Sequence, residues 1–232
     1  MRKFDLVMFD LDGTLVETAP EIMDAVNDTL ARFDLPPVSQ QQVNDWIGHG
    51  TLSLLVDAVA FATGRSVVEV RDSELLRTMV GEYNVFYSRR CGTRSHLYPQ
   101  VREALEFLRA QGTKLAVVTN KEGRYTRIVM EVQKITDLFD VVISGDTLAT
   151  KKPNPAGVAH CLAQFDVAPD RALFVGDSSI DAATARAAGC RLAATIWLQP
   201  GQPVAACQPA TVSSRIVLSY LIDSFWRLSD KR

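Results

Sequence analysis

Short apolar runs alternate with segments of helical period along most of this chain, and this alternation restricts the possible folds more than any other feature. Five runs are typical of buried strands: residues 4–9, 114–119, 141–144, 172–176 and 192–196. Between the later runs, apolar residues recur at the three- to four-residue spacing of a helix. Strands and helices that alternate in this way build a parallel sheet covered by helices on both faces. The sequence therefore predicts an α/β, Rossmann-like core.

The helices of this core are marked by apolar positions and by one terminal glycine. An alanine-rich stretch at 181–188 predicts the last of them, and Gly189 follows it as a C-terminal cap. The other three are marked by Val101, Leu105 and Leu108, by Ile128, Val132 and Ile135, and by Val158 and Leu162.

Residues 17–94 lack a strand-like run and carry helix signals instead. The first helix is marked by Ile22, Val26, Leu30 and Phe33 on one face. Two capping boxes follow, Ser39 with Gln42 and Ser66 with Glu69. After Ser66, one long amphipathic helix is expected from Val70, Leu75, Met79, Tyr83 and Phe86. We therefore predict a catalytic core formed by 1–16 and 95–232, a helical cap domain at 17–94, and hinges near 16–18 and 94–98.

The composition fits a folded protein without a strongly charged partner. Of the 232 residues, 47% are hydrophobic and 22% are charged, and the net charge is −2. This balance excludes a mainly disordered chain and does not favour nucleic acid or an anionic membrane as the main partner. The four cysteines lack metal-binding spacing, and we find neither a secretory signal nor an apolar run long enough to span a membrane. We expect a cytoplasmic protein, monomeric or homodimeric, that acts on a small molecule.

Two carboxylates follow the first apolar run. Asp10 and Asp12 are two residues apart, so on an extended strand end they point to the same side. They would meet at the carboxyl edge of the sheet, where open α/β sheets bind ligands. Neighbouring carboxylates repel each other and need a cation or a shared proton. The pair predicts a nucleophile and a general acid or base beside a metal, with a solvated turn as the alternative.

Polar groups also follow the next predicted strands. Thr119 and Asn120 end the second run, and their hydroxyl and amide groups suit phosphate oxygens, although a strand cap explains them equally well. Lys152 precedes Pro153, which favours an extended backbone. An ammonium group at this position could neutralise a phosphoryl group, while the alternative is a solvated surface lysine.

The fourth run ends in a further acid. Asp177 follows this run directly, and Asp181 comes four residues later at the start of a helix. Carboxylate oxygens are the ligands that Mg²⁺ prefers. Asp177 is therefore a predicted metal ligand. Asp181 is either a second ligand or a first-turn acid favoured by the helix dipole, and we expect Asp181 and Ser178 to support the direct ligands.

These four motifs, in this order, resemble those of the haloacid dehalogenase superfamily of aspartate-nucleophile phosphatases. The resemblance covers residues 1–195 and includes the helical insertion. Within the superfamily, several stretches resemble bacterial phosphoglycolate phosphatases: 12–20, 47–50, 118–121, 145–148 and 152–155.

The resemblance implies a Mg²⁺-dependent phosphatase that uses a covalent intermediate. Asp10 would attack the phosphorus of a phosphate monoester, and Asp12 would protonate the leaving alcohol and then activate water. Mg²⁺ would be held by Asp10, by the backbone carbonyl of Asp12 and by Asp177. The best single substrate is 2-phosphoglycolate, which would give glycolate and phosphate.

The resemblance also assigns the remaining motif residues. Lys152, Thr119 and Asn120 would bind the phosphoryl oxygens, and Asp181 would orient Lys152 or a metal-bound water. The loop Gly48, His49 and Gly50 would face the site from the cap and contribute to specificity, with an exposed histidine that does not contact substrate as the alternative for His49. A substrate carboxylate could be recognised by one of four arginines, with a solvated surface role as the alternative for each: Arg65, Arg89, Arg90 and Arg94.

Two alternative activities remain open from the sequence. The first is a phosphatase for a sugar phosphate or another biosynthetic phosphate, and the second is a phosphomutase of the same superfamily. The chain departs from the family pattern after residue 195, where 196–203 replaces a glycine-rich loop. Beyond that loop we expect an edge strand at 210–212 and a final helix at 216–228.

Overall fold

The central sheet has five parallel strands in the order β5-β4-β1-β6-β7. The computed structural model describes residues 4–194, so the loop, strand and helix expected beyond residue 195 lie outside the described residues. The strands are β1 (Leu6–Phe9), β4 (Lys114–Val118), β5 (Val141–Ile143), β6 (Ala172–Gly176) and β7 (Arg191–Ala194). Each corresponds to one of the predicted runs, so the predicted fold class is confirmed.

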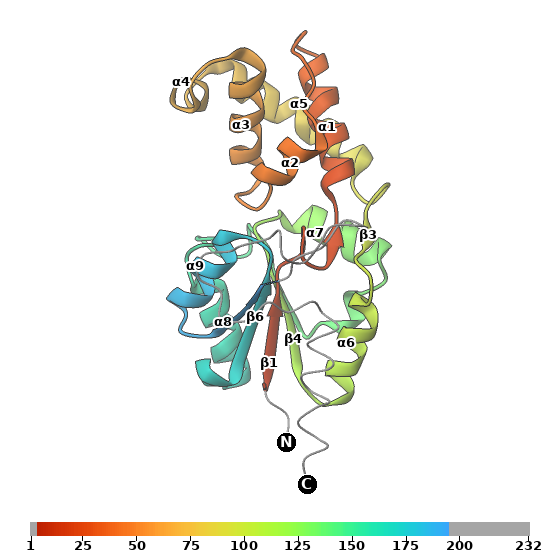
Figure 1. Cartoon of the computed structure of the whole chain (residues 1–232), viewed down its shortest axis with the longest axis vertical. Coiled ribbons are helices and arrows are strands. Elements are labelled where there is room, and N and C mark those ends of the chain that lie inside the picture. The colour runs from red at the N-terminus through yellow and green to blue at the C-terminus, as the bar shows by residue number, and fades with distance from the viewer. Residues whose placement is uncertain (1–3, 195–232) are drawn as a thin grey trace, which may run out of the picture.

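Helices cover both faces of this sheet (Figure 1). The pattern along β1 explains why: Val7 and Phe9 belong to the buried cluster of α6 (Val101–Ala110) and α7 (Gly123–Val132). The alternate residues of β1 pack in a second cluster, with α8 (Ala156–Phe165) and α9 (Ser179–Ala187). A strand that is apolar on both sides requires this two-sided cover. Two single-turn 3₁₀ helices, η1 (Thr136–Leu138) and η2 (Pro169–Arg171), precede β5 and β6.

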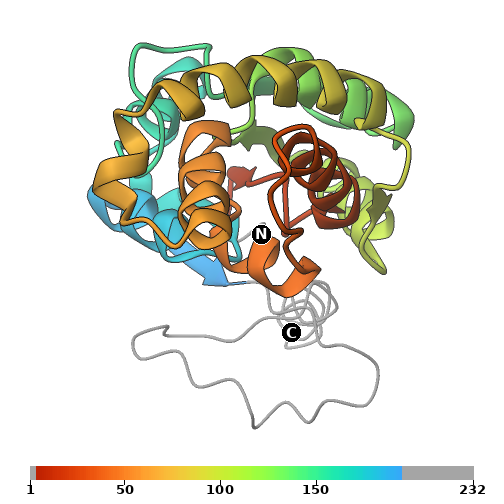
Figure 2. The same ribbon diagram turned by 90° about the horizontal axis from the view of Figure 1, so that it is seen from above.

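Five further helices lie over the carboxyl edge of the sheet (Figure 1). They are α1 (Ala19–Ala31), α2 (Gln40–Trp46), α3 (Thr51–Thr63), α4 (Val67–Arg71) and α5 (Glu74–Arg90). Seen from above, α5 crosses the molecule with α1 and α3 packed along it (Figure 2). We call residues 17–94 the helical cap, and its independence as a domain stays a prediction. No helix within residues 4–194 is both long and apolar enough to cross a membrane.

The predicted capping boxes of the helical cap are both present, but the predicted long helix is not. Ser39 and Ser66 cap α2 and α4 with reciprocal bonds to Gln42 and Glu69. The long helix expected after Ser66 breaks into α4 and α5, because the Ser73 side chain accepts from the backbone amide of Leu76 and starts a new helix. A serine in a helix competes with the backbone in this way and favours a cap.

The face that α7 buries also differs from the prediction. Val132 is 49% exposed, whereas Ile135 is fully buried but lies beyond the helix end. The buried stripe is instead Tyr125, Thr126, Val129 and Met130. The polar members of this stripe have partners, since the Thr126 hydroxyl donates to the backbone oxygen of Lys121 at 3.2 Å. The apolar positions therefore predict the helix but do not by themselves identify its buried stripe.

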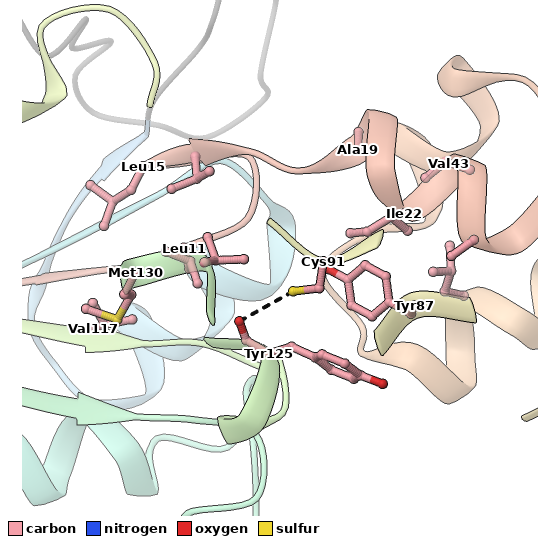
Figure 3. Close-up of a cluster of buried hydrophobic side chains, with 14 of the residues drawn as sticks. Leu11, Leu15, Ala19, Ile22, Val43, Tyr87, Cys91, Val117, Tyr125 and Met130 are labelled. Atoms are coloured by element: carbon pink, nitrogen blue, oxygen red, sulfur yellow. Dashed lines mark hydrogen bonds between the residues drawn. The ribbon is translucent and has the colours of Figure 1, made fainter. Parts of the chain in front are cut away.

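The helical cap and the sheet share one hydrophobic cluster (Figure 3). Leu11 and Leu15, from the loop after β1, extend the core toward α1, where Ile22 is buried. On the other side Cys91, just after α5, donates a weak hydrogen bond to the Tyr125 backbone oxygen at 3.7 Å. This continuous packing holds the helical cap against the carboxyl edge of the sheet.

Two short linkers join the helical cap to the core. They pair as the antiparallel strands β2 (Val16–Glu17) and β3 (His96–Leu97), at the predicted hinge positions. The Glu21 side chain is fully buried beside them and accepts hydrogen bonds of 3.0–3.1 Å from the backbone amides of Gly92, Arg94 and Ser95. This one carboxylate therefore fixes the return path of the chain.

Candidate active site

The four motifs lie together because each follows a strand at the same edge of the sheet. Asp10 directly follows β1, Thr119 follows β4, and Asp177 follows β6. Lys152 lies in the loop between β5 and α8. Since all these strands are parallel, their carboxyl ends meet beneath the helical cap.

Asp10 and Lys152 form a buried ion pair at the centre of the site. The Lys152 Nζ lies 2.9 Å from Asp10 Oδ1, and both side chains are at most 4% exposed. The backbone amide of Leu11 also donates to Oδ1, at 2.7 Å. Within the described residues these contacts fall on one oxygen, which leaves Asp10 Oδ2 for a substrate. Burial raises the pKa of Asp10 to about 7 against the opposing charge of Lys152.

Asp181 holds the same lysine from the other side. Its Oδ1 accepts from Lys152 at 2.7 Å, and its Oδ2 accepts from the Ser178 hydroxyl at 2.6 Å. Ser178 caps α9, so the start of this helix sets the position of the carboxylate. Burial alone would lower the pKa of Lys152, but Asp10 and Asp181 together raise it above its ordinary value. Lys152 is therefore a fixed cation.

Asp177 completes a group of three carboxylates. Asp10, Asp177 and Asp181 each place an oxygen within 4.8 Å of the others. Asp177 Oδ1 accepts from the Thr14 hydroxyl at 2.6 Å, and a Cβ on Gly13, whose φ is +78°, would overlap the same carboxylate. This close approach needs glycine.

The charge balance of this group fits a divalent cation. One ammonium, Lys152, serves three acids, and it contacts only Asp10 and Asp181. Loss of solvation, followed by the charge of Asp181, raises the pKa of Asp177 to about 6. Carboxylate oxygens that are short of positive charge are suitable ligands for Mg²⁺. Asp181 uses both of its oxygens already, so Asp10 and Asp177 are the better side-chain ligands.

Asp12 is held away from these acids by two other residues. The Thr18 hydroxyl donates to Asp12 Oδ1 at 2.7 Å. The Lys121 Nζ lies 3.2 Å from both carboxylate oxygens and also donates to the hydroxyl of Tyr87 at 2.6 Å. Burial would lower the pKa of Lys121, but Asp12 and other negative groups raise it.

Thr119 and Asn120 lie at the site in different ways. Thr119 is buried, and its hydroxyl accepts from the backbone amide of Lys121 at 3.3 Å. The Asn120 Nδ2 donates at 2.9 Å to the backbone oxygens of Gly48 and of Lys152. Its amide donor is thus used to tie the cap loop to the lysine loop. The Asn120 Oδ1 is buried and has no hydrogen-bond partner among the described residues.

Three consecutive residues after β4 each contact the helical cap. Asn120 binds Gly48, Lys121 binds Tyr87, and the Thr51 hydroxyl donates to Glu122 Oε2 at 3.0 Å. We call residues 120–122 the cap-docking segment. With these contacts made, the helical cap is closed over the site.

A cavity lies between the cap-docking segment and the helical cap. Its unfilled space, including the open mouth, is about 450 Å³. Of the cap loop, Gly48 and Gly50 line it, but His49 is exposed and is not among the lining residues. The core residues that line it are Asp10, Asp12, Thr119, Asn120, Lys121 and Glu122.

None of the four arginines considered from the sequence lines this cavity. Arg90 pairs with Asp28 at 2.6 Å, and Arg94 pairs with Asp24 at 2.7 Å. Arg65 and Arg89 are exposed. These positions do not support carboxylate recognition by the arginines.

Several site residues had no role in the sequence analysis. Lys121 lies in a stretch that carries the resemblance but has no role assigned from the sequence, and Tyr83 is marked there only as a helix position, while Tyr87 is not marked at all. Thr51 and Glu122 had no signal at all. Their common feature is a contact between the helical cap and the core, which a local pattern does not reveal.

The family comparison agrees with this geometry. Residues 7–195 match the model of the haloacid dehalogenase-like hydrolases. The chain belongs to this family. Because the match spans the helical cap as well as the sheet, the whole described site lies inside the region that the haloacid dehalogenase-like hydrolases share.

Individual relatives of this hydrolase are similar over most of its length. A phosphoglycolate phosphatase of Haemophilus influenzae is 38% identical over 81% of this chain and 84% of the relative. A phosphoglycolate phosphatase of Aliivibrio fischeri is 37% identical over 90% and 91%. The crystal structure of a predicted phosphoglycolate phosphatase from Haemophilus somnus superposes with a TM-score of 0.78 at 36% identity, covering 84% of this chain and 86% of that one.

Proposed function

We propose that this hydrolase is a Mg²⁺-dependent phosphatase that acts on a small phosphate monoester through an aspartyl-phosphate on Asp10. The observation that carries the proposal is the buried pair of Asp10 and Lys152, in which one oxygen of Asp10 has no partner among residues 4–194. The best single substrate is 2-phosphoglycolate, in line with the names of the relatives at 36–38% identity.

Asp10 is the nucleophile of this mechanism. Its Oδ2 forms a bond to phosphorus as the bond between phosphorus and the leaving oxygen breaks. The transferring phosphoryl group spreads negative charge over its equatorial oxygens, so a carboxylate needs nearby cations to approach it. Lys152 provides one such charge, held in place by Asp181. Thr119, buried directly after β4, would donate its hydroxyl to a phosphoryl oxygen.

Asp12 serves as the general acid and base. It gives a proton to the leaving oxygen in the first step and takes one from water in the second, when that water attacks phosphorus and releases Asp10. Asp12 follows Asp10 by two residues and lines the same cavity, so both steps use one face of the site. Proton transfer of this kind contributes roughly 10²- to 10⁴-fold to a rate.

A divalent cation fits beside these residues. Asp10, the backbone carbonyl of Asp12, and Asp177 would hold Mg²⁺, with Thr14 orienting Asp177. When bound, the ion supplies positive charge that offsets repulsion between the nucleophile and the phosphoryl group.

Closure of the helical cap excludes bulk water from the first step. The contacts of the cap-docking segment with Gly48, Thr51 and Tyr87 place the cap loop and two cap helices over Asp10. A lid of this kind also limits the size of the leaving group. Asn120 donates its amide to the backbone oxygens of Gly48 and Lys152, so its side chain acts here in the closure.

The test is phosphate release from 2-phosphoglycolate and from a panel of sugar phosphates, each with Mg²⁺ and with EDTA. We expect Mg²⁺-dependent release, fastest from 2-phosphoglycolate. Release that is fastest from a sugar phosphate would keep the mechanism and reject this substrate. Isomerisation of a sugar phosphate without release of phosphate would identify a phosphomutase and contradict the proposal.

A further inference from the structure

The two walls of the cavity differ in charge: the wall formed by the helical cap is uncharged, and the wall formed by the core is charged. The cap side carries no charged side chain: its lining residues are Ile22, Ile47, Gly48, Gly50, Thr51, Leu54, Tyr83 and Tyr87. The charged lining residues all come from the core, and three of them are acids: Asp10, Asp12 and Glu122. Lys121 is the one cation among the lining residues in the described part of the chain. A negative charge on the leaving group would therefore find one cationic partner.

Lys121 lies where it could pair with a negative charge on the leaving group. Its side chain is 3% exposed, and its Nζ lies 2.6 Å from the hydroxyl of Tyr87 and 4.9 Å from the centre of the Tyr87 ring. These contacts anchor the ammonium to helix α5 of the cap when the cap is closed. An ammonium group has three donors, so the hydroxyl of Tyr87 leaves two for a carboxylate.

The pairing of Lys121 with Asp12 is loose. Both Asp12 oxygens lie 3.2 Å from the Nζ, whereas a strong charge-assisted bond measures about 2.7–2.9 Å. The Thr18 hydroxyl holds Asp12 more tightly, at 2.7 Å. A second carboxylate in the cavity could therefore take over the ammonium, while Asp12 stays held through Thr18.

We propose that Lys121 is the binding site for a carboxylate on the leaving group of the substrate. The inference rests on the proposed phosphatase function and specifies its substrate class, a short phosphate ester whose alcohol carries a carboxylate. Binding exchanges one ion pair for another: the substrate carboxylate pairs with Lys121, and Asp12 is released toward the leaving oxygen. A neutral alcohol of the same size leaves Asp12 paired.

The other cations near the site are less suitable. Lys152 is already shared by Asp10 and Asp181. Lys151 is exposed at the rim, where its Nζ would lie 2.8 Å from a Cβ on Gly50, and it does not line the cavity. Lys151 is thus a matched control, since it is a neighbouring lysine of the same charge outside the cavity.

The test compares two esters that differ in one group, 2-phosphoglycolate and 2-hydroxyethyl phosphate. Their ratio of kcat/KM cancels losses common to both, such as a displaced Asp12 or a less stable fold. We expect Lys121→Met to reduce this ratio by roughly 10- to 100-fold, the contribution of a hydrogen bond to a charged group. Lys121→Arg should keep part of the preference, and Lys151→Met should keep all of it.

A binding measurement separates this inference from the proposed function. In an Asp10→Asn background, which should bind ester without turnover, calorimetry with the same two esters gives the preference for the carboxylate directly. If Lys121→Met removes that preference while neither ester is hydrolysed by the unaltered enzyme, the phosphatase proposal fails and the carboxylate site stands. An unchanged ratio in Lys121→Met, or its loss in Lys151→Met, overturns the inference.

Discussion

At the scale of single residues, one lysine serves more acids than it can neutralise. Lys152 contacts Asp10 and Asp181 but not Asp177, although the three carboxylates lie within 4.8 Å of one another. Such an arrangement costs stability in the absence of a cation and places reactivity where the cation and the phosphoryl group bind. The affinity of the site for a cation therefore depends on the negative charge of all three acids.

Asp12 has a role that a leaving-group series can isolate. Asp12→Ala should slow hydrolysis of alkyl phosphates by roughly 10²- to 10⁴-fold, because a poor leaving group needs the proton. An aryl phosphate such as p-nitrophenyl phosphate leaves without that help and should lose far less. The measurement is kcat/KM on both esters, because this ratio reports the steps up to departure of the alcohol and leaves out the later hydrolysis of the aspartyl-phosphate, in which Asp12 also acts. Equal losses on the two esters would contradict an acid role for Asp12.

The motif residues could be predicted because their meaning is local. Asp10, Thr119 and Asp177 each end a buried strand, and parallel strands end at one edge. Lys121 and Tyr87 could not be paired from the sequence, because they are 34 positions apart and their contact depends on how the cap closes. Asn120 was identified, but its bond to Gly48 could not be foreseen for the same reason.

At the scale of elements, Glu21 is the residue with most influence on the linkers. Glu21→Ala should lower the free energy of unfolding by about 2–4 kcal/mol, because three backbone amides lose their acceptor in a buried place. Glu74→Gln is the control: Glu74 is 81% exposed and pairs with Arg77, so its loss should cost below about 1 kcal/mol. Urea denaturation measures both. A Glu21→Ala loss as small as the control's would show that the linkers are held by other contacts.

The buried face of an element could be predicted where the element packs against one other part of the molecule, and less well where it packs against two. The strands follow from apolar runs, and α2 follows from its capping box. Helix α7 packs between the sheet and the helical cap, so its buried stripe includes Tyr125, which meets Tyr87 at 4.5 Å between ring centres. The break between α4 and α5 depends on Ser73, whose capping role competes with an otherwise continuous apolar pattern.

At the scale of the whole molecule, a bound cation should stabilise the fold, because its ligands follow different strands. Mg²⁺ at about 100 times its Kd should raise Tm by roughly 5–10 °C for a chain of this size. EDTA should reverse the rise, and Asp177→Asn should remove most of it. Asp170→Asn is the control, because Asp170 is an exposed acid in η2 at the opposite end of β6. Thermal unfolding gives these Tm values. If Mg²⁺ raised the Tm of Asp177→Asn as much as that of the unaltered protein, Asp177 would be rejected as a ligand.

The central claim is that Asp10 carries the phosphoryl group, and rapid quenching tests it most directly. A ³²P-labelled ester is mixed with the Mg²⁺-loaded enzyme and stopped in acid within the first turnover. We predict protein-bound label that is released by mild base and maps to the peptide containing Asp10. With an aryl ester, whose departure needs no acid, Asp12→Ala should accumulate more of it, because only water activation is slowed. Label-free protein during active turnover, or label and turnover that persist in Asp10→Asn, would contradict the account.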